Sequence, residues 1–314
     1  MTCFNKQFHA VVHSAFLVIF TWLASGADVH AKGQGTSSHA QRPEVKNLYW
    51  QPNDVKQGSP VFITVELRGP AREVNGMWLG KRIRFWHSDK AQVWVALAGA
   101  DIDQQPGSSD LKVSARIRGL MAELTKQIQV NEAQFGTGEA TVAQDYVNPT
   151  ADEQRQIAHD EVLKKRTFAR LTPRALWNGN FVKPIDADST PSFGETCLLN
   201  EEKTSRHLGT DFPAKEGTPV VASNSGIVVL AAPLFYEGNC VIVDHGDRLF
   251  TVYMHLREMR VHRGQRVRKR AIIGLSGRTG RVTGPHLHFE VVWNQSHLDA
   301  LQLLALTLPD RERH

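Results

Sequence analysis

The segment GPHLHFEV, residues 284–291, holds two histidines separated by a single residue and set among apolar neighbours of strand type. Side chains in a strand alternate between its two faces, so His286 and His288 point to one side while Leu287 and Phe289 point to the other. Two side chains that can each become cationic make a poor pair in an ordinary core. The pattern therefore raises the question of what the two imidazoles face together.

A carboxylate and two further imidazoles occur in other extended segments. His207 and Asp211 stand four residues apart in HLGTD, an even spacing that returns both side chains to one face of an extended chain. His255 lies in TVYMHL, which is also of strand type. A catalytic zinc site uses neutral imidazole nitrogens and carboxylate oxygens, and it keeps one of four positions for water. One carboxylate and two imidazoles would meet that requirement, but spacing leaves open which histidine of the HxH pair faces the metal.

The other histidines and one tyrosine are expected to have different roles. An HxH pair in a strand is, by itself, more often an incidental surface pair than a metal site. We expect His245, at a strand-to-turn junction, to be structural, and we place Tyr253 on the same face as His255, mainly for packing. The histidines expected at the surface are His87, His159, His262 and His297.

Length and composition are those of a soluble globular protein with room for two domains. The chain has 314 residues, of which 41% are hydrophobic and 22% charged, and its formal net charge of +5 suits an anionic partner. Cys197 and Cys240 remain after the N-terminal segment, and neither belongs to a CxxC pair. A disulfide between them and two separate buried thiols are equally compatible with the sequence.

The N-terminal residues are predicted to lie outside the fold. An apolar run over residues 15–24 follows Lys6 and is too short to span a bilayer, which needs about 20 residues. Small residues come next, and the whole predicts a cleaved secretory signal over residues 1–31, with an uncleaved membrane anchor as the alternative. The polar residues 32–47, rich in Gly and Ser, are typical of a flexible leader.

The remainder divides into β-rich segments around one helix. Short alternating strands between turn signals predict a small, Ig-like β-sandwich over residues 48–130. A helical connector is expected over residues 131–178, because Thr150 and Glu153 form a capping box ahead of a helical stretch. Residues 179–300 turn glycine-rich and β-like again, and a tail follows over residues 301–314.

Taken together, the motifs of the C-terminal third resemble the lysostaphin-type, LytM-like zinc metalloendopeptidases of bacterial cell walls. HLGTDFPAKEGTPVVASNSGIVV, GNCVIVDHGDRLFTVYMHL and VHRGQRVRKRAIIGLSGRTGRVTGPHLHFEV resemble three family segments in the same order. The resemblance implies an antiparallel β-sheet peptidase domain with the duplicated hybrid motif fold. It also implies His207, Asp211 and His288 as ligands of Zn²⁺ and His255 and His286 as the catalytic pair, with no other cofactor.

The resemblance implies an exported peptidoglycan hydrolase that acts in the periplasm or outside the cell and cleaves stem peptides or their cross-links. Nine basic residues between residues 257 and 281, against Glu258 alone, suit an acidic polymer such as peptidoglycan. Export and the lack of interleaved aromatic residues argue against nucleic acid. The alternatives are a non-catalytic regulator that binds an amidase or the wall, a latent enzyme with Asn200 or another nearby upstream residue at the open metal position, and a secreted protease for protein substrates.

Overall fold

The computed structural model describes residues 44–310, so the predicted signal over residues 1–31 and most of the leader lie outside the described residues. The first described strands build two sheets that share one apolar core. Inward-facing residues alternate along the strand Gly107–Ile117, as expected for a half-buried sheet, whereas the strand Pro60–Leu67 is buried along almost its whole length. One sheet contains β1 (Val45–Gln51), β3 (Pro60–Leu67), β7 (Val93–Gly99) and β6 (Trp86–His87). The other contains β2 (Val55–Lys56), β9 (Leu120–Asn131), β8 (Gly107–Ile117), β4 (Ala71–Trp78) and β5 (Lys81–Arg84).

The helix predicted from the Thr150 capping box is present. Helix α1 spans Ala151–Phe168, and the Thr150 hydroxyl and the Glu153 carboxylate each bond the other residue's backbone N–H. Leu163 and Phe168 of this helix pack against one face of the large C-terminal sheet, called the main sheet below. A small sheet and a 3-10 helix flank α1 in the chain: β10 (Thr137–Ala140), the 3-10 helix (Gln144–Tyr146), β11 (Thr196–Leu199) and β12 (Lys203–Arg206).

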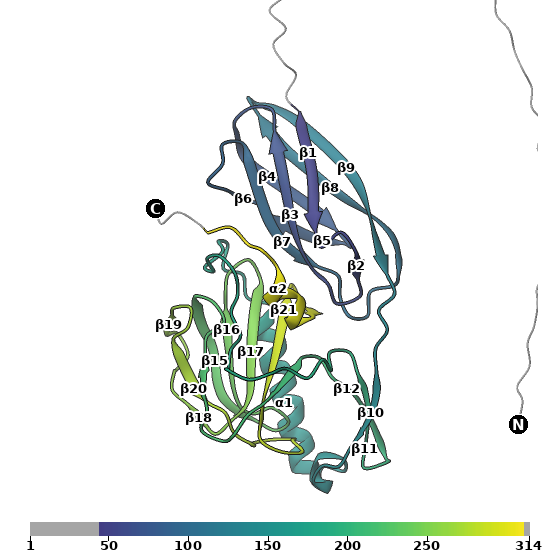
Figure 1. Ribbon diagram of the computed structural model, residues 1–314, viewed down its shortest axis with the longest axis vertical. Helices are drawn as coiled ribbons and strands as arrows, with labels where there is room; N and C mark the ends of the chain where they lie inside the picture. The colour runs from purple at the N-terminus through teal and green to yellow at the C-terminus, as the bar shows by residue number, and fades with distance from the viewer. Residues whose placement is uncertain (1–43, 311–314) are drawn as a thin grey trace, which may run out of the picture. The chain divides into compact units, whose positions relative to one another are not determined.

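The C-terminal part is built on an antiparallel sheet in which β21 (His286–Trp293) lies between β13 and β17 (Figure 1). This sheet continues through β16 and β15 to β19, and a short hairpin strand pairs with the end of β21. Its members are β13 (Thr210–Pro213), β15 (Gly226–Leu234), β16 (Gly238–Asp244), β17 (Leu249–Leu256), β19 (Arg266–Val267) and β22 (Ser296–Leu298). Beside it lie a small sheet of β14 (Pro219–Val221), β18 (Glu258–Met259) and β20 (Ile272–Leu275), and a final helix, α2 (Ala300–Ala305).

The two faces of the main sheet carry different apolar clusters. Leu287, Phe289 and Val291 of β21 are fully buried in the larger core, together with Tyr253 of β17. Val252 and Met254 of β17 point to the opposite face, where α1 covers part of the sheet. The remainder of that face is open to the groove described below.

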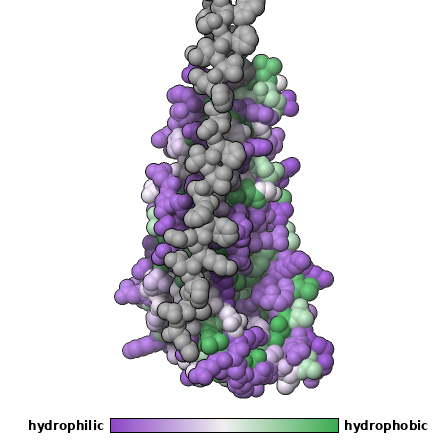
Figure 2. Space-filling model, turned by 90° about the vertical axis from the view of Figure 1, so that its right-hand side faces the viewer, coloured by the Kyte–Doolittle hydropathy of each residue, from purple (hydrophilic) through white to green (hydrophobic). Residues whose placement is uncertain are grey.

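The mainly β fold class predicted from the sequence, with an accessory sandwich and a connecting helix, is confirmed. The face of the molecule shown in Figure 2 is mostly hydrophilic, with apolar side chains in scattered patches. Among residues 44–310, no helix is both long enough and apolar enough to cross a membrane.

Candidate metal centre

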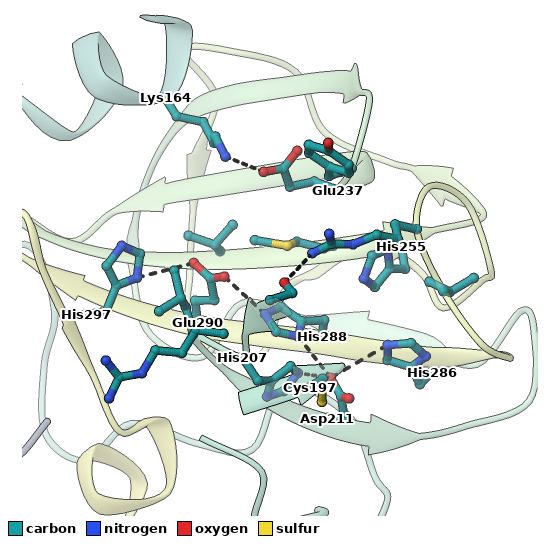
Figure 3. Close-up of a pocket in the computed structure, with 18 of the residues that line it drawn as sticks. Lys164, Cys197, His207, Asp211, Glu237, His255, His286, His288, Glu290 and His297 are labelled. Atoms are coloured by element: carbon teal, nitrogen blue, oxygen red, sulfur yellow. Dashed lines mark hydrogen bonds and ion pairs between the residues drawn. The ribbon is translucent and has the colours of Figure 1, made fainter. Parts of the chain in front are cut away.

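Three side chains predicted as metal ligands converge near the edge of the sheet formed by β13 and β21. Asp211 of β13 lies directly opposite His288 of β21 in the strand register, and His207 enters just after β12 ends. Their potential ligand atoms all lie within 4.8 Å of one another. Asp211 Oδ1 is 3.2 Å from His207 Nε2 and 2.9 Å from His288 Nδ1. The arrangement is shown in Figure 3.

Each imidazole of this cluster is oriented through its other ring nitrogen. His207 Nδ1 lies 3.0 Å from the Ser192 carbonyl oxygen, and His288 Nε2 lies 3.0 Å from Glu290 Oε1. Metal-binding histidines usually make such a bond to a carboxylate or a carbonyl, because it fixes the ring and the tautomer. The pattern leaves His207 Nε2 and His288 Nδ1 directed at Asp211.

Gly209 leaves room for the ring of His288. A Cβ at this position would lie 2.6 Å from His288 Nε2 and 2.6 Å from the Phe289 carbonyl oxygen. Both separations are below van der Waals contact, so any larger residue would displace the ring or the strand. The glycine of HLGTD is therefore required by the packing of the candidate metal cluster.

Charges within this cluster shift the pKa values of its members. Burial raises the pKa of Asp211, but hydrogen bonds from His207 and His288 outweigh it and leave the pKa well below its usual range. Burial lowers the pKa of His288, but hydrogen bonds to Asp211 and Glu290 raise it to about 10. For Glu290, burial is again outweighed, here by the bond to His288 and the charge of His297, and its pKa falls to about 2.

A β-bulge in β17 directs His255 towards this cluster. The pairing of β17 with β16 shifts between Tyr253 and Leu256, where only Cys240 lies opposite both Met254 and His255. His255 adopts φ +61°, a left-handed conformation that is uncommon for any residue other than glycine. Tyr253 and Leu256 consequently both face the core, and Met254 and His255 both line the groove.

The bulge corrects one expectation from the sequence. Tyr253 was predicted on the face of His255, by regular alternation, but it is fully buried on the opposite side of the sheet. Its hydroxyl accepts hydrogen bonds from the Ser223 N–H and the Thr251 hydroxyl. It therefore packs in the core and does not contribute a hydrogen bond to the site.

His255 and His286 are held in similar ways at the edge of the cluster. His255 Nδ1 lies 2.9 Å from the Thr279 carbonyl oxygen, and His286 Nδ1 lies 2.8 Å from that of Gly284. Because a carbonyl can only accept, each neutral ring carries its proton on Nδ1 and leaves Nε2 as an acceptor. The ring centroids are 4.9 Å apart, and His286 Nε2 lies 3.6 Å from Asp211 Oδ1.

His255 is neutral at physiological pH in this environment. Burial is the main reason that its pKa falls to about 3, and the neighbouring charges of His288 and His286 lower it further. Its backbone N–H donates to the Glu237 carbonyl oxygen, and the Thr279 hydroxyl bonds the Leu256 carbonyl oxygen. These two bonds hold the backbone of His255 and Leu256, and the Thr279 carbonyl oxygen holds the ring.

The cluster opens into a groove of about 590 Å³. Helix α1 contributes Lys164 to one wall, where its ammonium pairs with the buried carboxylate of Glu237. Burial lowers the pKa of Lys164, but the charge of Glu237 outweighs it and raises the pKa above its usual value. The groove thus combines a candidate metal cluster, two acceptor imidazoles and walls from distant parts of the chain.

Several functional neighbours escaped the sequence analysis. Glu290 was not singled out, although it stands two residues after His288 and alternation places it on the same face. Nothing in the sequence links Lys164 with Glu237, because they are 73 positions apart. His297 was predicted at the surface, but it lines the groove and its Nδ1 lies 3.7 Å from Glu290 Oε2.

Other expectations can be compared directly with the structure. His245 is fully buried between the Ser225 carbonyl oxygen and the Thr251 hydroxyl, which agrees with a structural role. Cys197 and Cys240 are both free thiols. The Asn200 side chain bonds the backbone of Val142 through both its oxygen and its nitrogen, so it does not occupy the open metal position.

Comparisons with known proteins find relatives of the C-terminal part of the chain. The model of Peptidase family M23 matches residues 205–300. Peptidoglycan DD-endopeptidase ShyA of Vibrio cholerae serotype O1 is 41% identical over 114 residues, which are 35% of this chain and 26% of that protein. DD-carboxypeptidase/endopeptidase Mpg of Neisseria meningitidis serogroup B is 38% identical over 104 residues, 33% of this chain and 24% of that protein. The chain thus matches about a quarter of the length of each relative.

A solved structure shares the fold over more of the chain. The crystal structure of a protein from Pseudomonas aeruginosa, described as a peptidase M23, superposes with a TM-score of 0.61 and 23% sequence identity. The superposition covers 80% of this chain and 96% of the Pseudomonas aeruginosa chain. The family resemblance predicted from the motifs is confirmed: residues 205–300 match Peptidase family M23, a family of metal-dependent peptidases.

Proposed function

We propose that this protein is an exported zinc metalloendopeptidase that hydrolyses peptide bonds in the stems or cross-links of bacterial peptidoglycan. The observation that carries the proposal is the convergence of His207, Asp211 and His288, with ligand atoms within 4.8 Å, beside two further imidazoles in one groove. Relatives named as peptidoglycan DD-endopeptidases support the substrate class and an action in the cell envelope.

The donor set fits a zinc ion. Two imidazoles and one carboxylate are the ligand types that zinc prefers, and three protein ligands leave one position for a substrate or water. The Ser192 carbonyl and the Glu290 carboxylate orient the two rings, as is usual around bound zinc. When bound, the ion supplies Lewis acidity that activates water and polarises a peptide carbonyl near neutral pH.

The remaining residues have the properties of proton carriers. His255 and His286 each present Nε2 as an acceptor, because Nδ1 is engaged by a carbonyl oxygen. His286 can accept a proton at Nε2 and then, as an imidazolium, donate it to the leaving amine or to a developing oxyanion. His255, which its low pKa keeps neutral, can accept a hydrogen bond at Nε2 from a reacting water. Burial and the fixed carbonyl contacts hold both rings in place, so little reorganisation accompanies the transfer.

The test compares zinc content and activity on purified peptidoglycan in the wild-type protein and in single histidine variants. We expect about one zinc ion per chain in the wild type and loss of both zinc and activity in His288→Ala. His286→Ala should keep its zinc and lose activity by about 100-fold or more. His262→Ala, at an exposed histidine outside the groove, is the matched control and should change neither.

Two outcomes would decide against the proposal. A wild-type protein that holds no zinc would remove the metal centre itself. A wild-type protein that holds zinc but releases no peptide from peptidoglycan would favour a regulator that binds an amidase or the wall.

A further inference from the structure

One arginine lines the same groove as the candidate metal cluster and is held there by neutral groups. Arg281 follows the GRTG turn, and its backbone N–H donates to the Tyr236 carbonyl oxygen over 2.8 Å. One guanidinium nitrogen, Nη2, donates to the Ser205 hydroxyl over 3.0 Å. The guanidinium carbon lies 4.7 Å from the centroid of the Tyr236 ring. A stacked, hydrogen-bonded guanidinium of this kind has a defined position in the groove.

The charge of Arg281 is not matched by an ion pair within residues 44–310. Glu237, the acidic residue whose charge acts on Arg281, is already bonded to Lys164. Arg278, three residues earlier, is exposed and does have an acidic partner in Glu216. Burial is the main cause that lowers the pKa of Arg281, so the surroundings supply less solvation than water does. A half-buried cation without an anion is costly unless a ligand provides the anion.

The carboxylates that line the groove have other partners and do not bind Arg281. Glu290 is bonded to His288, Asp211 lies within the candidate metal cluster, and Glu161 pairs with Lys164. Of the cations that line the groove within residues 44–310, Lys164 and Arg206 have acidic partners, and Lys165 is exposed to solvent. Arg281 is the half-buried cation without an ion pair, and several of its donors are uncommitted. A guanidinium presents a planar fork of N–H groups, which matches the two oxygens of a carboxylate.

We infer that Arg281 binds a free carboxylate of the substrate peptide, so that the groove selects peptides that carry a carboxylate near the scissile bond over the corresponding carboxamides. The inference rests on the proposed function, because it assigns a substrate group to the same groove. Peptidoglycan stems end in carboxylates, which can be converted to carboxamides without a change in peptide length. The residue acts in substrate binding and leaves metal binding to His207, Asp211 and His288.

The experiment measures kcat and KM on a cross-linked peptidoglycan dimer and on the same dimer with its carboxylates converted to carboxamides. We expect the wild type to prefer the carboxylate form by about 10- to 100-fold in kcat/KM. Arg281→Gln should lose that preference through a higher KM and cleave the amidated dimer as the wild type does. Arg281→Lys should restore part of it, because an ammonium keeps the charge without the fork.

The controls separate recognition from structure. Arg278→Gln removes an exposed arginine of the same turn and should leave the preference unchanged. An equal loss on both substrates in Arg281→Gln, with zinc retained, would assign Arg281 to the support of the Tyr236 turn and overturn the inference. Equal rates of the wild type on both substrates would overturn it as well.

Binding distinguishes this inference from the proposed function. If the wild type cleaves neither dimer, the hydrolase proposal fails, and calorimetric titration with the two dimers then decides the role of Arg281. Tighter binding of the carboxylate form, lost in Arg281→Gln, would uphold the inference. Equal affinities for the two dimers would overturn it.

Discussion

The two faces of strand β21 differ completely although their residues alternate along one segment. His286, His288 and Glu290 line the groove, whereas Leu287, Phe289 and Val291 are fully buried in the core. On the first face, each polar side chain makes a hydrogen bond, and this bond either shifts its pKa, as for His288 and Glu290, or fixes its tautomer, as for His286. On the second face, the contacts are apolar and close-packed. One face therefore determines chemistry and the other determines the stability of the fold that holds it.

The largest expected effect on stability comes from the core face. Phe289 is fully buried and its ring lies 5.2 Å from that of Tyr253, so Phe289→Ala would leave a cavity. We expect the free energy of unfolding to fall by about 3–5 kcal/mol, as measured by urea denaturation. The folded fraction should retain its zinc. Ile272→Ala, at a half-exposed side chain, is the control; a loss of zinc from folded Phe289→Ala would show that the two faces are not separable.

Part of the pH dependence of stability should come from a buried histidine on the core side, in addition to the part from His255 in the groove. Burial lowers the pKa of His245 to about 4, from an ordinary value near 6.5. Between these values the unfolded chain binds a proton that the folded chain excludes, so stability is full above pH 6.5 and falls as the pH drops to 4. The loss should reach about 3 kcal/mol.

The variant His245→Gln isolates this contribution. Urea denaturation between pH 7 and pH 4, in the presence of a chelator, should give a flatter pH dependence for the variant than for the wild type. The variant should also be less stable at pH 7, because glutamine cannot reproduce the bonds to Ser225 and Thr251. Parallel curves for the two proteins would assign the acid sensitivity to other groups.

A smaller effect is expected when only the orienting carboxylate of the site face is changed. Glu290→Gln removes the charge beside His288 but keeps a group of the same shape. We expect zinc affinity to fall by about 10- to 100-fold, as measured by competition with a chelator, with less effect on the free energy of unfolding. Glu258→Gln, at an exposed carboxylate, serves as the control. An unchanged affinity would mean that the packing of His288 suffices to orient its ring.

Sequence reasoning recovered the elements that depend on local pattern. Alternation in GPHLHFEV correctly separated the two faces of β21, and the Thr150 capping box predicted the start of α1. The proposed ligands required the family resemblance, since spacing alone left His286 and His288 equivalent. Glu290 was within reach of the same alternation rule and was overlooked.

The contacts that escaped prediction depend on distance in the chain or on irregular backbone. Lys164 meets Glu237 only because α1 packs across the sheet, and His297 reaches the groove through the hairpin of β22. Tyr253 was assigned to the wrong face because the bulge interrupts the period of two. No local sequence pattern predicts these contacts or the bulge, because each depends on how distant segments pack.

The bulge at Met254 and His255 has a consequence for the length of the chain. Before it, odd-numbered residues such as Tyr253 face the core; after it, even-numbered ones such as Leu256 do. The bulge therefore shifts the core-facing positions of the strand by one residue. Deletion of Met254 would remove the bulge and leave one groove-facing position in place of two. The shortened strand would therefore lose either the apolar contact that Met254 makes near α1 or the imidazole of His255.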